Sequence, residues 1–428
     1  MSDESNDKSS GTESSASNVS KSVGSKRSLS DWISYYLEYT SNTEAPTSYH
    51  YWTAMSLIAG ALQRKCHIKW GHARIYPNMY IILVGPSGRT RKGVAMDIGK
   101  SMFEKLGLTI TADSLSKEQM IAVMQGAHKT YIDELGHTKG HCSIMTFSKE
   151  LSVLLGQRDI GLLADLTDWY DSTDVWRYET KGKGTFKING MCYNLLGATA
   201  PDWIKSMLPA EAIGGGFTAR IIFVVEDKKG KTVELPTHGE DREKLRILLE
   251  LDLKRIADMA GEFIFTKDAL EAYADWYRGQ DADAEKGFLA VEDPHFASYC
   301  ERRATHIKKI SMSLSASRSS DMSITVEDFN RAKNLLEKTE RKMPLVFGGV
   351  GNSFLSDVTN KILIYLVAKG SATKQELLSH FYRDIGTLRT FSEIIEILTS
   401  MRAIEVVIDK SRKESYYKYI GDRIKRNN

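Results

Sequence analysis

The chain has 428 residues, of which 42% are hydrophobic and 26% are charged, and its net charge is +3. This composition is typical of a globular protein, and the length predicts about two or three domains. The small net charge is no global basic signature, so any nucleic-acid contact must come from local patches. The sequence has no run of about 18 apolar residues and no apolar signal segment, so we expect a cytoplasmic protein without a membrane partner.

Four scattered cysteines without paired spacing argue against a zinc site or a disulfide framework. Residues 1–27 are rich in Ser and nearly free of large apolar side chains, which predicts a disordered tail. The segment 28–78 predicts two helices and a hairpin. Ser30 is the expected cap of the first helix, the second helix runs over about 49–62, and the hairpin turns at Gly71.

The segment 79–239 is predicted to form the core domain, organised around YIILVGPSGRTRKGVAM at Tyr80–Met96. The apolar run Tyr80–Val84 predicts a buried strand, the GPSG that follows is turn chemistry, and a helical pattern begins at Lys92. A strand, a glycine-bearing loop with a lysine and then a helix is an arrangement that holds nucleotide phosphates. The residues expected to bind ATP and Mg²⁺ here are Gly85, Ser87, Gly88, Thr90, Lys92 and Gly93.

This loop departs from the usual phosphate-binding spacing of Gly, four residues, Gly-Lys and then Ser or Thr. Lys92 stands seven residues after Gly85, Arg91 replaces the second glycine, and Gly93 replaces the hydroxyl residue that binds magnesium. Ser87 or Thr90 could supply that hydroxyl instead. The alternative interpretation is an ordinary turn between a strand and a helix on a basic surface.

Two further buried strands are predicted, at Cys142–Phe147 and Met191–Gly197. Glu150 follows the first of them, at a position where an NTPase needs an acid to hold magnesium or polarise water. An equal alternative is that Glu150 only complements the dipole of the helix that follows. The segment 131–134 also ends in two acids, but the residues before it are too polar for a core strand. Asn194 is polar inside an apolar strand and must therefore have a hydrogen-bond partner.

A predicted hairpin precedes the Met191–Gly197 strand, and its tip carries Lys181 and Lys183. A fourth apolar strand, Ile221–Val225, follows directly after Arg220. We expect Arg220 to point out of the core, because burying an unpaired guanidinium is unfavourable. A salt bridge to a nearby acid, Asp202 or Glu211, is the alternative.

The segment 240–347 predicts an accessory region of helices without a chemical motif. The segment 353–428 predicts three helices followed by a hairpin, which indicates a winged helix. Residues 355–428 contain 13 Lys and Arg against 9 Asp and Glu, a net +4, although winged helices also mediate protein contacts. The residues expected to contact DNA, in this unit and in the earlier hairpin, are Lys181, Lys183, Arg389, Lys410, Arg412 and Lys413.

The segments RIYPNMYIILVGPSG, FSKELSVLLG, NLLGATAPDWI and GGGFTARIIFV resemble P-loop proteins of undefined function from phages and mobile elements, described as primase- or helicase-like. The resemblance covers about residues 45–235 and implies an ATP-binding α/β core in a replication context. The order of the pieces is also similar to AAA+ helicases of the viral replicative type, which place a basic hairpin before the sensor strand and an Arg before the last strand. By position, the resemblance implies a phosphate lysine at Lys92, a catalytic and metal-binding acid at Glu150, a polar sensor at Asn194 or Thr199, and an arginine finger at Arg220.

The sequence therefore predicts an α/β P-loop NTPase of AAA+-like organisation, with N-terminal helices, a helical accessory region and a C-terminal winged helix. The favoured function is a ring-forming, DNA-dependent ATPase, either a helicase or a replication initiator of a phage or mobile element, working with primase or other replication proteins. One alternative is a DNA-binding initiator or loader adaptor whose degenerate P-loop does not hydrolyse ATP. A weaker alternative is a packaging or partitioning ATPase.

Overall fold

A computed structural model gives the structure of most of the chain. It describes residues 27–133, 135–156, 159–180, 184–209, 212–236, 239–347, 354–401, 403–409 and 414–420. The tail predicted over 1–27 therefore lies outside the described residues, except for Arg27. The guanidinium of Arg27 donates to the carbonyl oxygen of Ala316 at 2.8 Å, so this residue belongs to the folded part.

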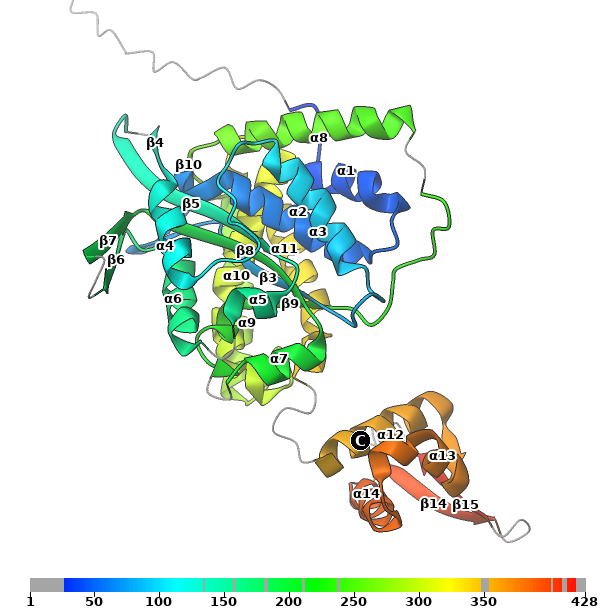
Figure 1. The fold of residues 1–428 in the computed structure, drawn as a ribbon. Helices are drawn as coiled ribbons and strands as arrows, with labels where there is room; N and C mark the ends of the chain where they lie inside the picture. The colour runs from blue at the N-terminus through cyan, green and yellow to red at the C-terminus, as the bar shows by residue number, and fades with distance from the viewer. Residues whose placement is uncertain are drawn as a thin grey trace, which may run out of the picture.

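The centre of the molecule is a five-stranded sheet with the order β4-β5-β8-β3-β9, which makes the chain a mixed α/β protein (Figure 1). All neighbouring strands are parallel except β4, which runs antiparallel to β5. The strands are β3 (Tyr80–Val84), β4 (His128–Ile132), β5 (Thr138–Ser148), β8 (Met191–Thr199) and β9 (Ile221–Val225). Every residue of β3, β8 and β9 is buried, as expected of parallel strands covered on both faces.

Helices cover both faces of this sheet. They are α1 (Trp32–Tyr39), α2 (Thr47–Leu62), α3 (Lys92–Glu104), α4 (Lys117–Gly126), α5 (Leu151–Leu155), α6 (Ile160–Tyr170) and α7 (Pro201–Met207). The Asn194 amide bonds to Ser56 of α2 on one face, whereas the Tyr80 hydroxyl bonds to the Leu166 carbonyl of α6 on the other. Helix α2 is buried on nearly all sides and packs against α1, α3 and the sheet.

Small sheets and short helices connect these layers. The hairpins predicted around Gly71 and before β8 are present, as β1 (Cys66–Trp70) with β2 (Ala73–Ile75) and β6 (Val175–Thr180) with β7 (Gly184–Asn189). Two-residue strands β10 (Gly261–Glu262), β11 (Ile264–Phe265) and β12 (Ser323–Ile324) add short pairings. The 3-10 helices are η1 (Thr40–Asn42), η2 (Gln63–Lys65), η4 (Thr218–Arg220), η5 (Pro294–Phe296) and η6 (Met343–Val346).

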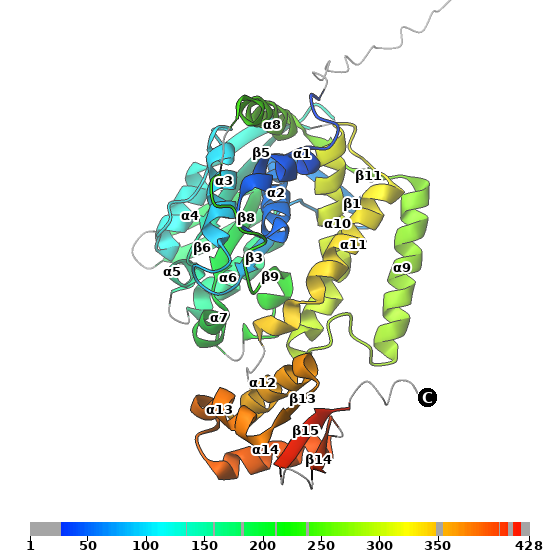
Figure 2. The same cartoon turned by 90° about the vertical axis from the view of Figure 1, so that its right-hand side faces the viewer.

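The helices after the sheet share its hydrophobic core. These helices are α8 (Glu240–Asp258), α9 (Lys267–Glu285), α10 (Ala297–Arg318) and α11 (Val326–Glu340). Helix α8 packs against α1 and α2, and α10 packs against η4 and α11 (Figure 2). One cluster of buried residues runs from Leu29 to Phe347, so the boundaries predicted at 78 and 239 do not divide the core.

The C-terminal unit has a separate core. It consists of α12 (Phe354–Lys369), β13 (Ser371–Thr373), α13 (Lys374–Ile385), α14 (Leu388–Ser400), β14 (Ile404–Asp409) and β15 (Glu414–Tyr419). The three predicted helices and the hairpin are present, and β13 completes an antiparallel sheet of order β13-β15-β14 that the sequence did not predict. Its cluster of buried residues, from Val358 to Tyr417, has no member in common with the larger one.

One local prediction needs correction. The cap of α1 is Asp31 rather than Ser30, since the Asp31 carboxylate accepts from the Ser34 amide. Ile110, which lies between α3 and α4, forms an isolated parallel bridge with Met145 of β5. Residues 131 and 132 are the last two of β4, a mostly exposed edge strand, which agrees with the polar sequence before them.

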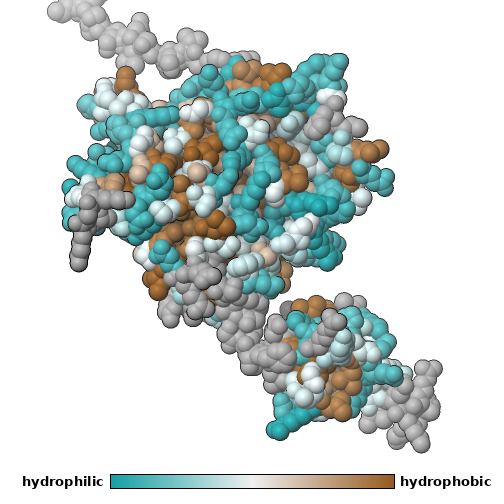
Figure 3. All heavy atoms as spheres, in the orientation of Figure 1, coloured by the Kyte–Doolittle hydropathy of each residue, from teal (hydrophilic) through white to brown (hydrophobic). Residues whose placement is uncertain are grey.

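The surface carries few large apolar areas in the view of Figure 3, where hydrophilic residues surround scattered apolar ones. No helix in the described part of the chain combines the length and apolar character needed to cross a bilayer. All four cysteines are free thiols, and three of them are buried.

Candidate functional site

The candidate site lies at the carboxyl edge of the sheet, where residues 85–91 connect β3 to α3. Val84 pairs with both Thr199 and Val225, so β3, β8 and β9 end at the same level. The loop starts inside this edge, because the Gly85 amide donates to the Thr199 carbonyl at 3.2 Å. Parallel strands that end together bring the residues after them into one place, which is where ligands bind in open α/β sheets.

Gly85 occupies a position that only glycine can fill. A Cβ atom there would lie 2.5 Å from the Glu226 carbonyl oxygen, 2.6 Å from the Tyr49 hydroxyl and 2.8 Å from the Thr90 hydroxyl. The backbone therefore passes through a tight gap between β9 and α2 before the loop opens to solvent. The requirement for glycine at this point is steric.

The tip of the loop is exposed, whereas its last part folds inward. Ser87 and Gly88 face solvent, and Gly88 has a left-handed backbone with φ of 70°. Thr90 is buried, and its hydroxyl donates to the Pro86 carbonyl at 3.2 Å. Of the two hydroxyls considered as magnesium ligands, only that of Ser87 is therefore open, while Gly93 in the first turn of α3 has no side chain to offer.

Lys92 is the first residue of α3, and the loop wraps around its ammonium group. The Nζ atom donates to the Gly85 carbonyl at 2.5 Å and approaches the Pro86 carbonyl at 3.4 Å. Burial lowers the pKa of Lys92 from its ordinary value, and the nearby Glu150 carboxylate partly offsets this effect.

Glu150 follows β5, two residues after the last strand residue. Ser148 pairs with Gly197, so Glu150 extends beyond β5 toward the level at which β8 ends in Thr199. Its backbone is extended (φ −125°, ψ 96°), and within the described residues its side chain makes no capping hydrogen bond to α5. Since only β8 separates β5 from β3, the ends of β5 and β3 lie about 10 Å apart.

Asn194 is not at this edge, which corrects its assignment as a polar sensor. The side-chain carbonyl oxygen of Asn194 accepts from the Met79 backbone amide at 2.8 Å. The side-chain amide nitrogen donates to the backbone carbonyl and the hydroxyl of Ser56. It is 2% exposed, so its hydrogen-bonding groups are used in packing β8 against α2. Of the two candidate sensors, Thr199 is the one that lies beside the loop.

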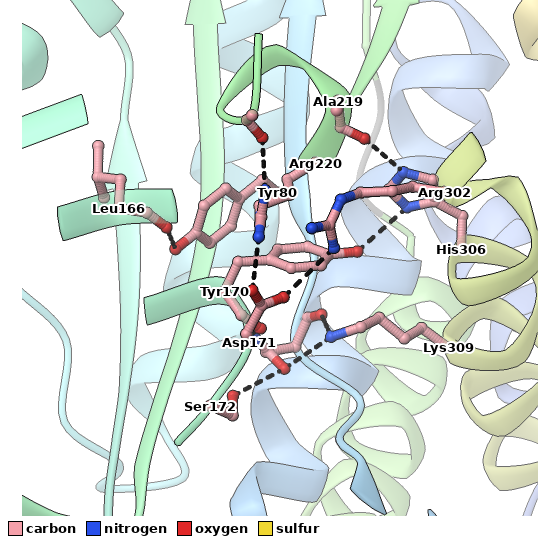
Figure 4. A network of polar contacts seen from close by, with 12 residues as sticks. Tyr80, Leu166, Tyr170, Asp171, Ser172, Ala219, Arg220, Arg302, His306 and Lys309 are labelled. Carbon is pink, nitrogen blue, oxygen red and sulfur yellow. Dashed lines mark hydrogen bonds and ion pairs between the residues drawn. The ribbon is translucent and has the colours of Figure 1, made fainter. Parts of the chain in front are cut away.

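Arg220 lies at the opposite, amino edge of the sheet, and the prediction that it points out of the core is wrong. It is 6% exposed and donates to the Gly216 carbonyl at 2.7 Å and to the Asp171 carboxylate at 2.5 Å. Arg302 of α10 approaches the same carboxylate at 3.4 Å. Figure 4 shows both guanidinium groups converging on Asp171, so a salt bridge explains the burial of Arg220, with a partner that the sequence did not single out.

Helix α10 contributes further buried polar groups to this network. The His306 ring contacts the Tyr170 hydroxyl at 3.2 Å and the Ala219 carbonyl at 3.1 Å, and burial lowers the pKa of His306 to about 3. The Lys309 ammonium donates to the backbone and side-chain oxygens of Asn78, and burial lowers the pKa of Lys309 to about 7. The sequence signal for this network was the run of basic residues in ERRATHIKK, residues 301–309 of α10. Nothing in the sequence indicated that this run packs against η4.

The predicted DNA contacts are largely outside the described residues. This holds for the hairpin lysines Lys181 and Lys183 and for the wing residues Lys410, Arg412 and Lys413. Arg389 is described, and its guanidinium pairs with Glu393 one turn later at 3.1 Å while remaining 90% exposed. Arg389 is therefore the one predicted DNA contact that the described part of the chain includes.

In the part of the chain that the structure describes, no group of three or more His, Cys, Asp or Glu side chains could hold a metal ion. Glu150 remains the one predicted metal ligand, as a single carboxylate.

Neither protein-family models nor curated proteins match this chain. The resemblance to mobile-element P-loop proteins thus stays a prediction from the sequence.

Proposed function

We propose that the chain is an ATP-binding P-loop NTPase of AAA+-like organisation that acts on DNA and assembles as a ring, as a helicase or replication initiator would. The observation that carries the proposal is that Lys92 and Glu150 both lie beyond the carboxyl edge of one parallel sheet. They follow β3 and β5, with the end of β8 between them. A cation and an acid held on either side of a glycine-bearing loop suit a phosphate–magnesium ligand.

In this proposal, different residues of the site bind the phosphates and the magnesium ion. The loop amides and the amino end of α3 bind the phosphates, and Lys92 exchanges its carbonyl partners for phosphate oxygens. Magnesium is a hard cation that takes oxygen ligands and needs few protein groups when phosphates supply the rest. The Glu150 carboxylate and the open Ser87 hydroxyl fit that donor set, and Thr199 lies where it could contact the terminal phosphate.

A second candidate function is favoured by the same loop. Gly93 has no hydroxyl, and the Thr90 hydroxyl is already bonded inside the loop. A chain that binds ATP without hydrolysing it, as a DNA-binding initiator or loader adaptor, would show these features. Nucleotide binding is common to both candidates, and hydrolysis separates them.

Hydrolysis of ATP with and without single-stranded DNA tests the main proposal. Lys92→Ala should abolish ATP binding and hydrolysis, whereas Lys105→Ala, at an exposed site just after the same helix, should behave as wild type. Arg91→Ala should reduce ATP binding and hydrolysis less than Lys92→Ala does. Unchanged ATP affinity in Lys92→Ala would refute the assignment of the phosphate lysine, and binding without DNA-stimulated hydrolysis would select the adaptor.

DNA binding is proposed for the C-terminal unit, whose helices and hairpin fit a winged helix. Its net charge of +4 over 355–428 supports the proposal. Helix α14 does not, because its charged residues are Arg389, Glu393 and Glu396. Removal of 355–428 should weaken binding of duplex DNA and flatten its dependence on salt by about 0.9 per lost phosphate contact. The same affinity and salt slope in the truncated chain would assign this unit to protein contacts.

A further inference from the structure

A cavity of about 350 Å³ lies against the outer side of α3, next to the candidate phosphate loop. Val94 and Ile98, which are one turn apart on α3, form one wall. The other wall comes from the end of α1 and from the segment after β9. The residues lining those parts are Tyr39, Val233 and Pro236. The lining is thus mainly apolar, although the cavity opens at the surface.

The rim of the cavity nearest the loop is polar and fixed. Glu44 accepts from the Lys229 ammonium at 2.6 Å and from the Arg91 guanidinium at 2.9 Å. These two contacts lower the pKa of Glu44 to about 2, so its carboxylate is ionised at neutral pH. Three separate segments of the chain therefore meet at this rim.

Arg91 belongs both to the loop and to the cavity, and its backbone is strained. Its φ of 55° and ψ of 33° place it in the left-handed region, which is unfavourable for a residue with a side chain. The guanidinium holds this conformation through Glu44 and through the Gly88 carbonyl at 3.2 Å. Strain of this kind persists mainly at functional sites, where the side chain is needed.

We propose that this cavity holds the base of the nucleotide whose phosphates lie on residues 85–91. The inference rests on the proposed function, and it adds the place and the chemical class of the base. A planar purine has two apolar faces that fit between Val94 and Tyr39, and its polar edge meets the Glu44–Arg91 rim. Ligand cavities usually measure about 300–1,000 Å³, so the size also fits.

Purines are expected over pyrimidines because the larger ring buries more apolar area against these walls. Inorganic phosphates have no base to place in the cavity. Inorganic tripolyphosphate is therefore a probe of the loop without the cavity, and ATP is a probe of both.

The test is calorimetric titration of the full chain with ATP and with tripolyphosphate. Val94→Trp fills the cavity from a helix position that is 40% exposed, so the variant is expected to fold. It should bind ATP roughly tenfold more weakly and tripolyphosphate as wild type does. Leu270→Trp, at a helix position of α9 that is 42% exposed, is the matched control and should change neither affinity.

Each other outcome has a defined meaning. If Val94→Trp binds ATP as wild type, or if wild type binds ATP no better than tripolyphosphate, the base lies elsewhere while the proposed function survives. If wild type binds neither probe, the proposed function and this inference both fail. Should Val94→Trp lose its fold, Val94→Asn, which is close to valine in size but polar, takes its place and should weaken ATP binding by roughly threefold.

Discussion

Two glycines at the ends of the loop have opposite roles in stability. At Gly85 a methyl group would meet a carbonyl and two hydroxyls, whereas at Gly93 it would meet no atom within 4 Å. Gly85→Ala should lower the free energy of unfolding by about 1–3 kcal/mol through overpacking. Gly93→Ala should raise it by about 0.4–1 kcal/mol, since alanine restricts the unfolded chain and favours the helix. Urea denaturation of both variants measures the difference, and equal effects would contradict this account.

The buried His306 makes stability depend on pH. A carbonyl can only accept, so Nε2 carries the proton toward Ala219 and Nδ1 accepts from the Tyr170 hydroxyl. The ring is therefore neutral in the folded state, with its pKa lowered from 6.5 to about 3. Between these two values the unfolded chain binds the additional proton, so stability falls as the pH falls, by about 1.4 kcal/mol per pH unit.

His306→Gln should remove that contribution, because an amide can donate to Ala219 and accept from Tyr170 without titrating. Unfolding free energies measured at several pH values between about 6.5 and 4.5 should fall less steeply for the variant than for wild type. His50 and His141 are also buried with pKa values lowered to about 4, so some slope remains. An unchanged slope would show that His306 does not titrate in this range.

At the scale of elements, Asp171 joins the end of α6 to η4 and to α10. The Arg220 side chain is 7% exposed and Asp171 is 44% exposed, whereas Arg302 is 33% exposed. A double-mutant cycle of Arg220→Ala with Asp171→Ala should give a coupling energy of about 1–2 kcal/mol. The cycle of Arg302→Ala with Asp171→Ala should give about 0.5 kcal/mol, because that pair is longer and more exposed. Equal couplings would contradict the burial argument.

Variants of Arg220 also test the proposed assembly of the chain into a ring. The network lies about 17 Å from the loop along β9, so Arg220→Ala should keep its ATP affinity. If Arg220 leaves Asp171 to act on a neighbouring subunit, mixing Arg220→Ala with Lys92→Ala should restore some hydrolysis. Without any rescue, Arg220 is a structural residue, and the ring proposal needs another arginine.

The sequence predicted the sheet better than the site. Strands β3, β8 and β9 were found because each is an uninterrupted apolar run between turn residues. Which strands are neighbours, and that they run parallel, could not be read from periodicity. Only the parallel direction puts Glu150, after β5, and Arg220, before β9, at opposite edges of the sheet. Asn194 was misassigned because a polar residue in a strand serves packing or chemistry equally well until its partner Ser56 is known. The three-residue β13 is too short for a pattern.

At the scale of the whole molecule, the described residues form two separate hydrophobic cores, and we predict two unfolding transitions. Leu83→Ala, in the larger core, should lower only the midpoint of the larger transition in scanning calorimetry. Leu377→Ala, in the C-terminal core, should lower only the smaller one. Each substitution removes a fully buried side chain and should cost about 2–5 kcal/mol. A single transition that both substitutions shift would contradict independent folding.

The order of strands also has a consequence for synthesis. Tyr80 of β3 pairs with Leu195 of β8 on one side and with Ile221 of β9 on the other, so β3 is made long before both of its neighbours. At about 5–20 residues per second, the ribosome needs roughly 7–30 s to proceed from the loop to the end of β9. Until then an apolar strand and its glycine loop have no sheet to enter. The nascent chain should therefore depend on a chaperone at this stage. If the chain binds a nucleotide as proposed, that nucleotide can protect it only after Val225 has left the exit tunnel.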